Sequence, residues 1–192
     1  MIGRLSSVHA AVAALAFFCL SLAPAMAADQ EVARGHYLVT VMSCTDCHTP
    51  GNFRGHPDLG RFLGGSDVGL AVPGLGVFVA PNLTPDPATG LGQWTETEIV
   101  TALTTGVRPD GRILAPVMPW RSYAHLTQAD AQAIAAYLKS LPPVRNDVAG
   151  PFGLKERPTV PVSVILSPDQ YARLPDPGAP APPESRQGSS HP

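Results

Sequence analysis

The sequence predicts a small, all-α domain with a long loop in its middle and a proline-rich C-terminal tail. Residues 30–43, 95–105 and 127–141 each have the apolar spacing of an amphipathic helix. Residues 50–94 lack a helical period and are rich in glycine and proline, and so long a non-helical stretch in a compact domain usually serves a function. The chain has 192 residues, which suits one domain or at most a small pair.

Local signals set the ends of the second and third helices. Thr95 followed three residues later by Glu98 fits a capping box, and Gly106 fits a C-terminal stop. Thr127 is placed to cap the third helix, and Pro142-Pro143 ends it. We therefore expect two well-bounded helices after the long loop.

Residues 1–27 resemble a secretory signal peptide. Arg4 gives a positive start, an apolar run covers residues 10–23, and Ala25-Met26-Ala27 forms an A-x-A cleavage site. The alternative is an uncleaved membrane anchor, because residues 10–28 are nearly long enough to span a bilayer. Pro24 and the small residues near it favour cleavage. The expected mature domain covers residues 28–143, followed by a tail of residues 144–192, and the expected compartment is the periplasm.

Composition narrows the range of partners. The formal net charge is −2 and no basic patch is evident, which argues against a nucleic-acid partner. Aromatic residues are only 6% and charged residues only 15%, so the domain would gain from a large apolar group at its centre. Of the three cysteines, Cys19 lies in the leader, which leaves Cys44 and Cys47 and no disulfide framework.

Residues 44–48 read Cys-Thr-Asp-Cys-His, the C-x-x-C-H attachment pattern of a c-type haem. In this pattern Cys44 and Cys47 form thioether bonds to the haem vinyl groups, and His48 is carried to the iron as an axial ligand. Two alternatives are a thiol-disulfide motif and half of a zinc site. The first needs a βαβ context and the second needs further Cys or His ligands at defined spacing, and neither is evident. The sequence therefore predicts one covalent haem c, and we expect the long loop over residues 50–94 to wrap the edge of the haem.

The second axial ligand must come from elsewhere in the chain. Met42 approaches Cys44 on the same helix and cannot reach the opposite haem face. Met118 lies in a stiff loop between Pro116 and Pro119, and His/Met ligation is common in electron transfer. We therefore assign Met118, with a core-filling methionine as the alternative reading. The rival ligands are the histidines at four other positions: His36, His56, His125 and His191.

Several smaller expectations concern the loop and the tail. Residues 70–79 alternate loosely and predict a hairpin around Pro73-Gly74, and residues 160–166 predict a docked strand. From Pro175 onward we expect disorder. Asn82-Leu83-Thr84 matches a glycosylation sequon, which we interpret as coincidence, since Asn and Thr suit turns.

Two expectations concern the haem surroundings. His48 should donate its other ring N–H to a backbone carbonyl, for which Pro57 is one candidate. Trp94 either borders a haem propionate, because an indole N–H seeks an acceptor, or simply packs in the core.

The chain resembles a class I c-type cytochrome over about residues 30–143. More narrowly, it resembles the cytochrome c subunits of bacterial membrane-linked dehydrogenases that oxidise alcohols, gluconate or aldehydes. The matching segments are Gly35 and Tyr37, the C-x-x-C-H run, Asn82-Leu83-Thr84-Pro85-Asp86, Thr89-Gly90-Leu91-Gly92-Gln93-Trp94, Asp110-Gly111, Met118-Pro119-Trp120 and Ala136-Tyr137-Leu138-Lys139-Ser140-Leu141. The resemblance implies that the first and last helices pack crosswise near Gly35 and Tyr137. Members of that group often carry three haem modules, whereas this chain has one C-x-x-C-H run.

By this resemblance the chain is an electron carrier rather than an enzyme. A dehydrogenase would be its donor, an oxidase or another cytochrome its acceptor, and peripheral membrane association is compatible with this role. The alternative is a haem enzyme or small-ligand sensor with an open iron position. A third reading is an anchoring subunit whose tail docks a dehydrogenase, and this role is compatible with electron transfer.

Overall fold

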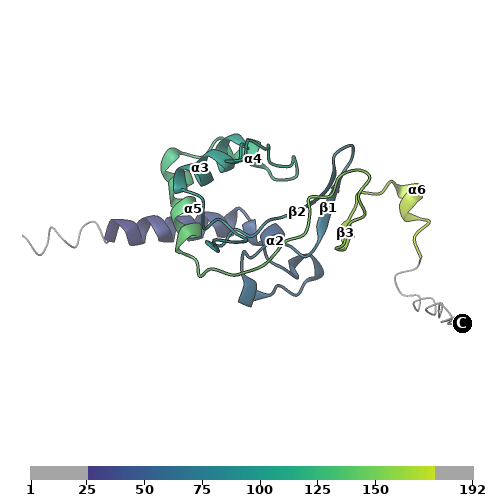
Figure 1. Cartoon of the computed structure of the whole chain (residues 1–192), viewed down its shortest axis with the longest axis horizontal. Helices are drawn as coiled ribbons and strands as arrows, with labels where there is room; N and C mark the ends of the chain where they lie inside the picture. The colour runs from purple at the N-terminus through teal and green to yellow at the C-terminus, as the bar shows by residue number, and fades with distance from the viewer. Residues whose placement is uncertain (1–25, 176–192) are drawn as a thin grey trace, which may run out of the picture.

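The computed structural model describes residues 26–175 of the chain (Figure 1). The leader before residue 26 and the tail after residue 175 lie outside these residues, and so do the expectations about their cleavage and disorder. A helix covers residues 26–41 and is followed by the remaining elements in this order: α2 (Cys44–His48), η1 (Asn52–Arg54), η2 (Leu59–Arg61), β1 (Gly69–Val72), β2 (Gly76–Val79), α3 (Glu96–Thr105), α4 (Trp120–Tyr123), α5 (Gln128–Ser140), β3 (Val162–Ser163) and α6 (Pro168–Tyr171). Within residues 26–175, no helix has the length and apolar character needed to cross a membrane.

The helix over residues 26–41 crosses α5 (Figure 1), and Gly35 lies at the contact between them. A Cβ atom at Gly35 would collide with the backbone oxygen of Ala133 and would lie 2.6 Å from the Cβ of Tyr137. Gly35 is therefore required for close helix contact and is not a tolerated surface glycine. An ion pair of 2.8 Å between Arg34 Nε and Asp130 Oδ1 also joins the two helices. The expected crossing near Gly35 and Tyr137 is confirmed.

The apolar core lies between these two helices and α3. Its buried side chains come from all three helices and from the loop before α3: Leu38, Val39, Leu63, Leu91, Ile99, Val100, Leu103, Ala131, Ile134, Ala135 and Leu138. Both predicted helix starts are confirmed, since Thr95 and Glu98 form the capping box and Thr127 accepts a hydrogen bond from the Asp130 N–H. Gly106 ends α3 with a φ of 76°, in the left-handed region that glycine adopts most readily.

The long middle segment contains a small sheet, so the all-α description is not confirmed. Strands β1 and β2 form the predicted antiparallel hairpin, in which Gly69 pairs with Val79 and Val72 pairs with Gly76. Strand β3, from the predicted strand region at residues 160–166, pairs in parallel with β1 and completes the order β2-β1-β3. The strands themselves were expected, but the pairing of β3 with β1 was not, because the two segments lie far apart in the sequence.

We call residues 144–163 the C-terminal strap, because this segment runs from the end of α5 across the middle loop to β3 (Figure 1). Its backbone exchanges two hydrogen bonds of 2.8 Å between Phe152 and Val77. Near its start, Val144 and Asn146 bond to the loop segments that contain Thr84 and Gly64. The part of the tail that directly follows the helical domain is therefore attached to it along its length.

Candidate functional site

The C-x-x-C-H run forms the short helix α2, which begins after Ser43 in a left-handed conformation with a φ of 55°. Cys44 and Cys47 lie three residues apart on this single turn, and both are partly buried free thiols. Burial, assisted by the charges of Cys47 and Asp46, raises the pKa of Cys44 to about 11, and burial followed by Asp46 raises the pKa of Cys47. Thiol-disulfide exchange needs a lowered thiol pKa, so this environment does not suit a thioredoxin-like motif.

His48 is buried, with only 5% of its surface exposed. Its Nδ1 lies 2.8 Å from the carbonyl oxygen of Pro81, which leaves Nε2 as the ring nitrogen available to a metal. Burial lowers the pKa of His48, although the Pro81 contact acts in the opposite direction, so the ring is neutral as a metal ligand must be. The expected backbone acceptor is confirmed, but Pro57 is the wrong residue. Pro57 is exposed, and the chain brings Pro81 to His48 instead.

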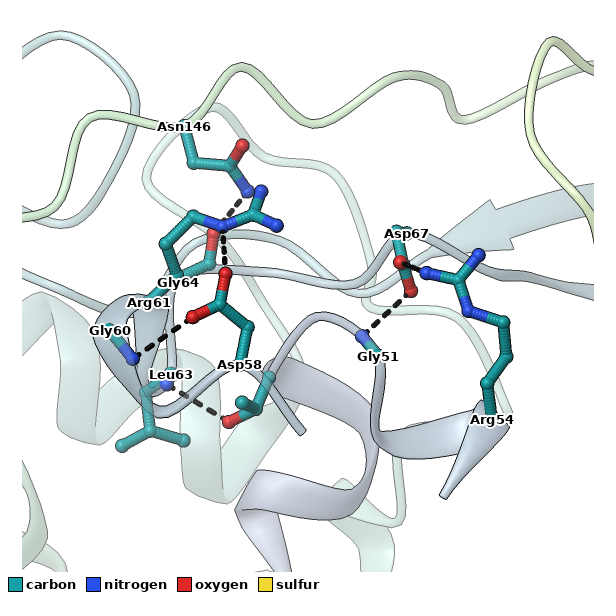
Figure 2. A network of polar contacts seen from close by, with 10 residues as sticks. Gly51, Arg54, Asp58, Gly60, Arg61, Leu63, Gly64, Asp67 and Asn146 are labelled. Atoms are coloured by element: carbon teal, nitrogen blue, oxygen red, sulfur yellow. Dashed lines mark hydrogen bonds and ion pairs between the residues drawn. The ribbon is translucent and has the colours of Figure 1, made fainter. Parts of the chain in front are cut away.

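Two loop segments hold the backbone around His48. The Gly65 N–H donates to the His48 carbonyl over 2.8 Å, and the Leu63 N–H donates to the Thr49 hydroxyl over 3.0 Å. Leu63 is fully buried with a φ of 55°, a strained conformation for a residue with a side chain. The Leu83 N–H in turn donates to the Leu63 carbonyl over 2.9 Å. Figure 2 shows Leu63 and Gly64 in this region of the loop.

Met118 lies in the loop between α3 and α4, which is fixed by its own backbone bonds. Its N–H donates to Ala115 and its carbonyl accepts from Trp120, over 2.9 Å and 2.8 Å. The Met118 side chain is partly buried and packs against the apolar core, and so does Cys44. The structure therefore brings the thioether of Met118 and the C-x-x-C-H helix to the same core.

Tyr123, on α4, packs against the same apolar core as Cys44 and Met118. The pKa of Tyr123 is raised to about 12, first by burial and then by the negative charges that Cys44 and Cys47 carry as thiolates. Conversion of these sulfurs to uncharged thioethers would remove the second effect and leave the first. Nothing in the local sequence pattern around Tyr123 distinguishes it from a packing residue.

The rival histidines within residues 26–175 lie on the surface. His36 is exposed and stacks on Tyr137 with ring centroids 5.1 Å apart, and His56 and His125 are also exposed. His191 falls outside the described residues. In the same described range, no group of three or more His, Cys, Asp or Glu side chains could hold a metal ion, so the zinc alternative has no ligand set there.

Two buried donors near the Met118 loop have no hydrogen-bond partner among the residues that the structure describes: Trp120 Nε1 and Arg108 Nε. The Arg108 guanidinium lies 5.3 Å from the centroid of the Trp94 ring, and its Nε is 3.4 Å from Asp110 Oδ1. Trp94 itself packs against the core, so the packing interpretation is confirmed and a propionate contact stays a prediction. Buried N–H donors without a hydrogen-bond partner are uncommon, and ordered water or a bound group often supplies the acceptor.

These residues fit a covalently attached haem. Two protonated thiols stand on one turn, an oriented neutral imidazole follows them, and a thioether lies on the same apolar core. The buried Trp120 N–H, which has no hydrogen-bond partner among the described residues, suits an acidic group of such a cofactor. Sequence reasoning missed Pro81 and Arg108, since a backbone carbonyl and a loop arginine carry no distinctive pattern.

Comparisons with known proteins agree with this interpretation. The family model described as cytochrome c matches residues 32–142. The chain is 41% identical over 125 residues to the cytochrome c subunit of a quinone alcohol dehydrogenase from Gluconacetobacter polyoxogenes, covering 63% of this chain and 26% of that protein. It is 32% identical over 138 residues to the fructose dehydrogenase cytochrome subunit of Gluconobacter japonicus, covering 69% and 27%. A diheme cytochrome c-type protein of Cereibacter sphaeroides is 33% identical over 127 residues, covering 64% and 42%. The chain thus spans about a quarter to two fifths of the length of these relatives.

Proposed function

This chain belongs to the cytochrome c family, and from that premise we propose that it is a periplasmic one-electron carrier with a single covalent haem c. Cytochromes c transfer electrons through a covalently bound haem, and the one C-x-x-C-H run supports a count of one here. Cys44 and Cys47 are the proposed attachment points, and His48 and Met118 the proposed axial ligands. The observation that supports this most strongly is the buried, neutral His48 held by Pro81 next to two partly buried thiols.

Each proposed residue has a distinct physical role. A bound haem would supply an iron that can gain and lose one electron. Cys44 and Cys47 fix the cofactor to α2, and the Pro81 carbonyl fixes the ring plane and tautomer of His48. Met118 would supply a soft sulfur ligand to the iron, which would favour Fe(II) and raise the reduction potential. The apolar core around Cys44 and Met118 excludes water and acts in the same direction.

We further propose that the electron donor is a dehydrogenase. The relatives include cytochrome subunits of alcohol and fructose dehydrogenases, which supports a partner of this class. The proposed acceptor is an oxidase or another cytochrome. In this role the chain carries electrons and has no substrate chemistry of its own.

The test begins with covalent attachment. Protein exported from cells with haem-ligation machinery should retain its haem in acid and organic solvent, and Cys44→Ala and Cys47→Ala should each lose most holoprotein. Ferrous wild-type protein should bind carbon monoxide poorly, whereas Met118→Ala should bind it readily and have a lower potential. A drop of ~59 mV corresponds to a tenfold change in the one-electron equilibrium. Extractable haem would overturn the proposal. Ready carbon monoxide binding by the wild type would favour an enzyme or sensor with an open iron position.

A further inference from the structure

The C-terminal strap begins just beyond residue 142, where the match to the family model ends. Its first residues lie across the two loop segments that flank His48. One is the segment around Asn82, which follows the Pro81 carbonyl, and the other is the segment around Gly64, which precedes the Gly65 N–H. These contacts couple a segment outside the family match to the surroundings of the histidine.

The first contact is to the Pro81 side of His48. The Asn82 Nδ2 donates to the Val144 carbonyl over 2.7 Å, and the Val144 N–H donates to the Thr84 hydroxyl over 3.0 Å. The Thr84 hydroxyl donates to Asn82 Oδ1 over 2.8 Å. Asn82 is only 2% exposed and Thr84 is fully buried, so water does not compete for these bonds. The strap therefore fixes the short segment that directly follows the Pro81 carbonyl.

The second contact is to the other side of His48. The Asn146 Nδ2 donates to the Gly64 carbonyl over 2.7 Å, as Figure 2 shows. The Asn146 N–H donates to the Thr89 hydroxyl, which also accepts from Asn82. The next residue along the loop, Gly65, donates to the His48 carbonyl. The strap thus reaches His48 by a second route that does not pass through Pro81.

The fit between the strap and the loop is close as well as polar. A Cβ atom at Gly65 would collide with Val148 Cγ2, and a Cβ atom at Gly64 would lie 3.3 Å from Val144 Cγ1. Glycines at these two positions let the strap pack directly on the loop backbone. Since the Leu83 N–H also bonds to the Leu63 carbonyl, the two loop segments and the strap form one hydrogen-bonded unit.

We propose that residues 144–146 of the strap are a positioning clamp for the axial histidine, a role that rests on the proposed function. The clamp keeps the Pro81 carbonyl at hydrogen-bond distance from His48 Nδ1. Donation of this proton makes the imidazole a more basic ligand, which favours the oxidised iron. Loosening the clamp weakens that donation, so it shifts the equilibrium towards the reduced protein and raises the potential.

The test uses haem-bearing protein and isosteric variants. Thr84→Val removes the hydroxyl that binds Val144 at nearly constant volume, Thr84→Ser restores it, and Thr159→Val makes the same change at an exposed position of the strap. Asn146→Ala breaks the second route. We expect Thr84→Val to favour reduction at least threefold, ~28 mV at ~59 mV per tenfold. The exchange of the His48 Nδ1 proton, followed by NMR in the reduced state, should accelerate. Thr84→Ser should restore both values, and Thr159→Val should leave them unchanged.

The outcomes separate the clamp from the proposed function. Absence of covalent haem in the wild type would overturn both. A second outcome is a wild-type protein that carries electrons as proposed, with Thr84→Val and Asn146→Ala both retaining its reduction potential and its rate of proton exchange. The clamp proposal would then be wrong, and the proposed function would stand. If Thr84→Val fails to fold, Asn146→Ala decides the question alone, because Asn146 is only partly buried and its loss leaves the Asn82 contacts intact.

Discussion

The helical part and the loop part of this molecule are held together by different forces. In the helical part, formed by residues 26–41, α3 and α5, the buried side chains are apolar, as with Val39, Leu103 and Ile134. Within the described range, the buried polar residues all lie between residues 48 and 86: His48, Thr49, Ser66, Asn82, Thr84 and Asp86. Side-chain hydrogen bonds to the backbone thus stabilise the loops around the proposed haem ligand, whereas apolar burial stabilises the helices.

This difference explains how His48, the proposed axial ligand, is held in place. Helix packing tolerates small adjustments of side chains, but a buried amide or hydroxyl bonds only in a defined geometry. A metal ligand needs that accuracy, and His48 obtains it from Pro81 and Gly65 rather than from the core. The comparison predicts how each part responds when its own kind of contact is removed.

The largest effect is expected from Ile134→Ala in the helical part. Ile134 is 2% exposed in the core, and its truncation should lower the free energy of unfolding by about 4 kcal/mol through lost burial and a residual cavity. Urea unfolding of the holoprotein measures this value. Gln132→Ala, an exposed substitution on the same helix, should change it by less than ~0.5 kcal/mol. Equal effects of the two substitutions would show that α5 does not depend on its apolar face.

The next effect tests the loop part through Asn82→Ala. The substitution removes two N–H donations and the Oδ1 acceptor of the Thr84 N–H, and so leaves buried groups unpaired. We expect the free energy of unfolding to fall by about 3 kcal/mol, again measured by urea unfolding. Asn52→Ala, which removes a single bond to the Asp46 carbonyl, is the matched control and should cost about 1 kcal/mol. If Asn82→Ala costs no more than this control, polar contacts are not what holds the loops.

Gly35→Ala should change the stability by less than the two substitutions above, and the direction of the change is the informative result. On an exposed helix, alanine in place of glycine would stabilise the protein by about 1 kcal/mol through helix propensity. At Gly35 the new Cβ meets the Ala133 backbone, which cannot move aside as a flexible side chain could, so we expect a loss of about 2 kcal/mol. Thermal unfolding of the two proteins gives the sign. A rise in the melting temperature would mean that the helices can separate at their crossing without loss.

The helical part of the molecule could be predicted from the sequence more fully than the contacts of the loop part. Helical periodicity and capping located α3 and α5, and a five-residue pattern located Cys44, Cys47 and His48. Pro81 and Asn146 were not predicted, because a backbone carbonyl is contributed by any residue and the strap contacts join positions far apart in the chain. The haem attachment, Met118 ligation and domain boundaries stay predictions, whereas the hairpin and the strand at residues 160–166 are confirmed.

The smallest expected effect is a loss of stability at acid pH, which should affect the loop part before the helical part. Asp86 accepts hydrogen bonds of 2.7 Å from both the hydroxyl and the N–H of Thr89, and a third from the Ala88 N–H. These bonds, led by the Thr89 hydroxyl, lower the pKa of Asp86 below its ordinary value of 3.8. A carboxylate whose pKa is lower in the folded than in the unfolded state stabilises the fold above the unfolded value. That contribution is lost as the pH falls through the folded value.

The stability advantage of the wild type over Asp86→Asn should therefore be complete at pH 7 and shrink below about pH 4. Urea midpoints of the holoproteins across this range measure it, and Asp147→Asn, at an exposed strap position, controls for the loss of one negative charge. Thr89 also binds Asn82 and Asn146, so acid should loosen the loop part before the helices. The reduction potential should therefore begin to change at a pH where the helical circular dichroism signal is still constant. A gap between wild type and Asp86→Asn that stays constant down to pH 3 would mean that the Thr89 bonds do not favour the ionised carboxylate. The acid sensitivity of the loops would then have another origin.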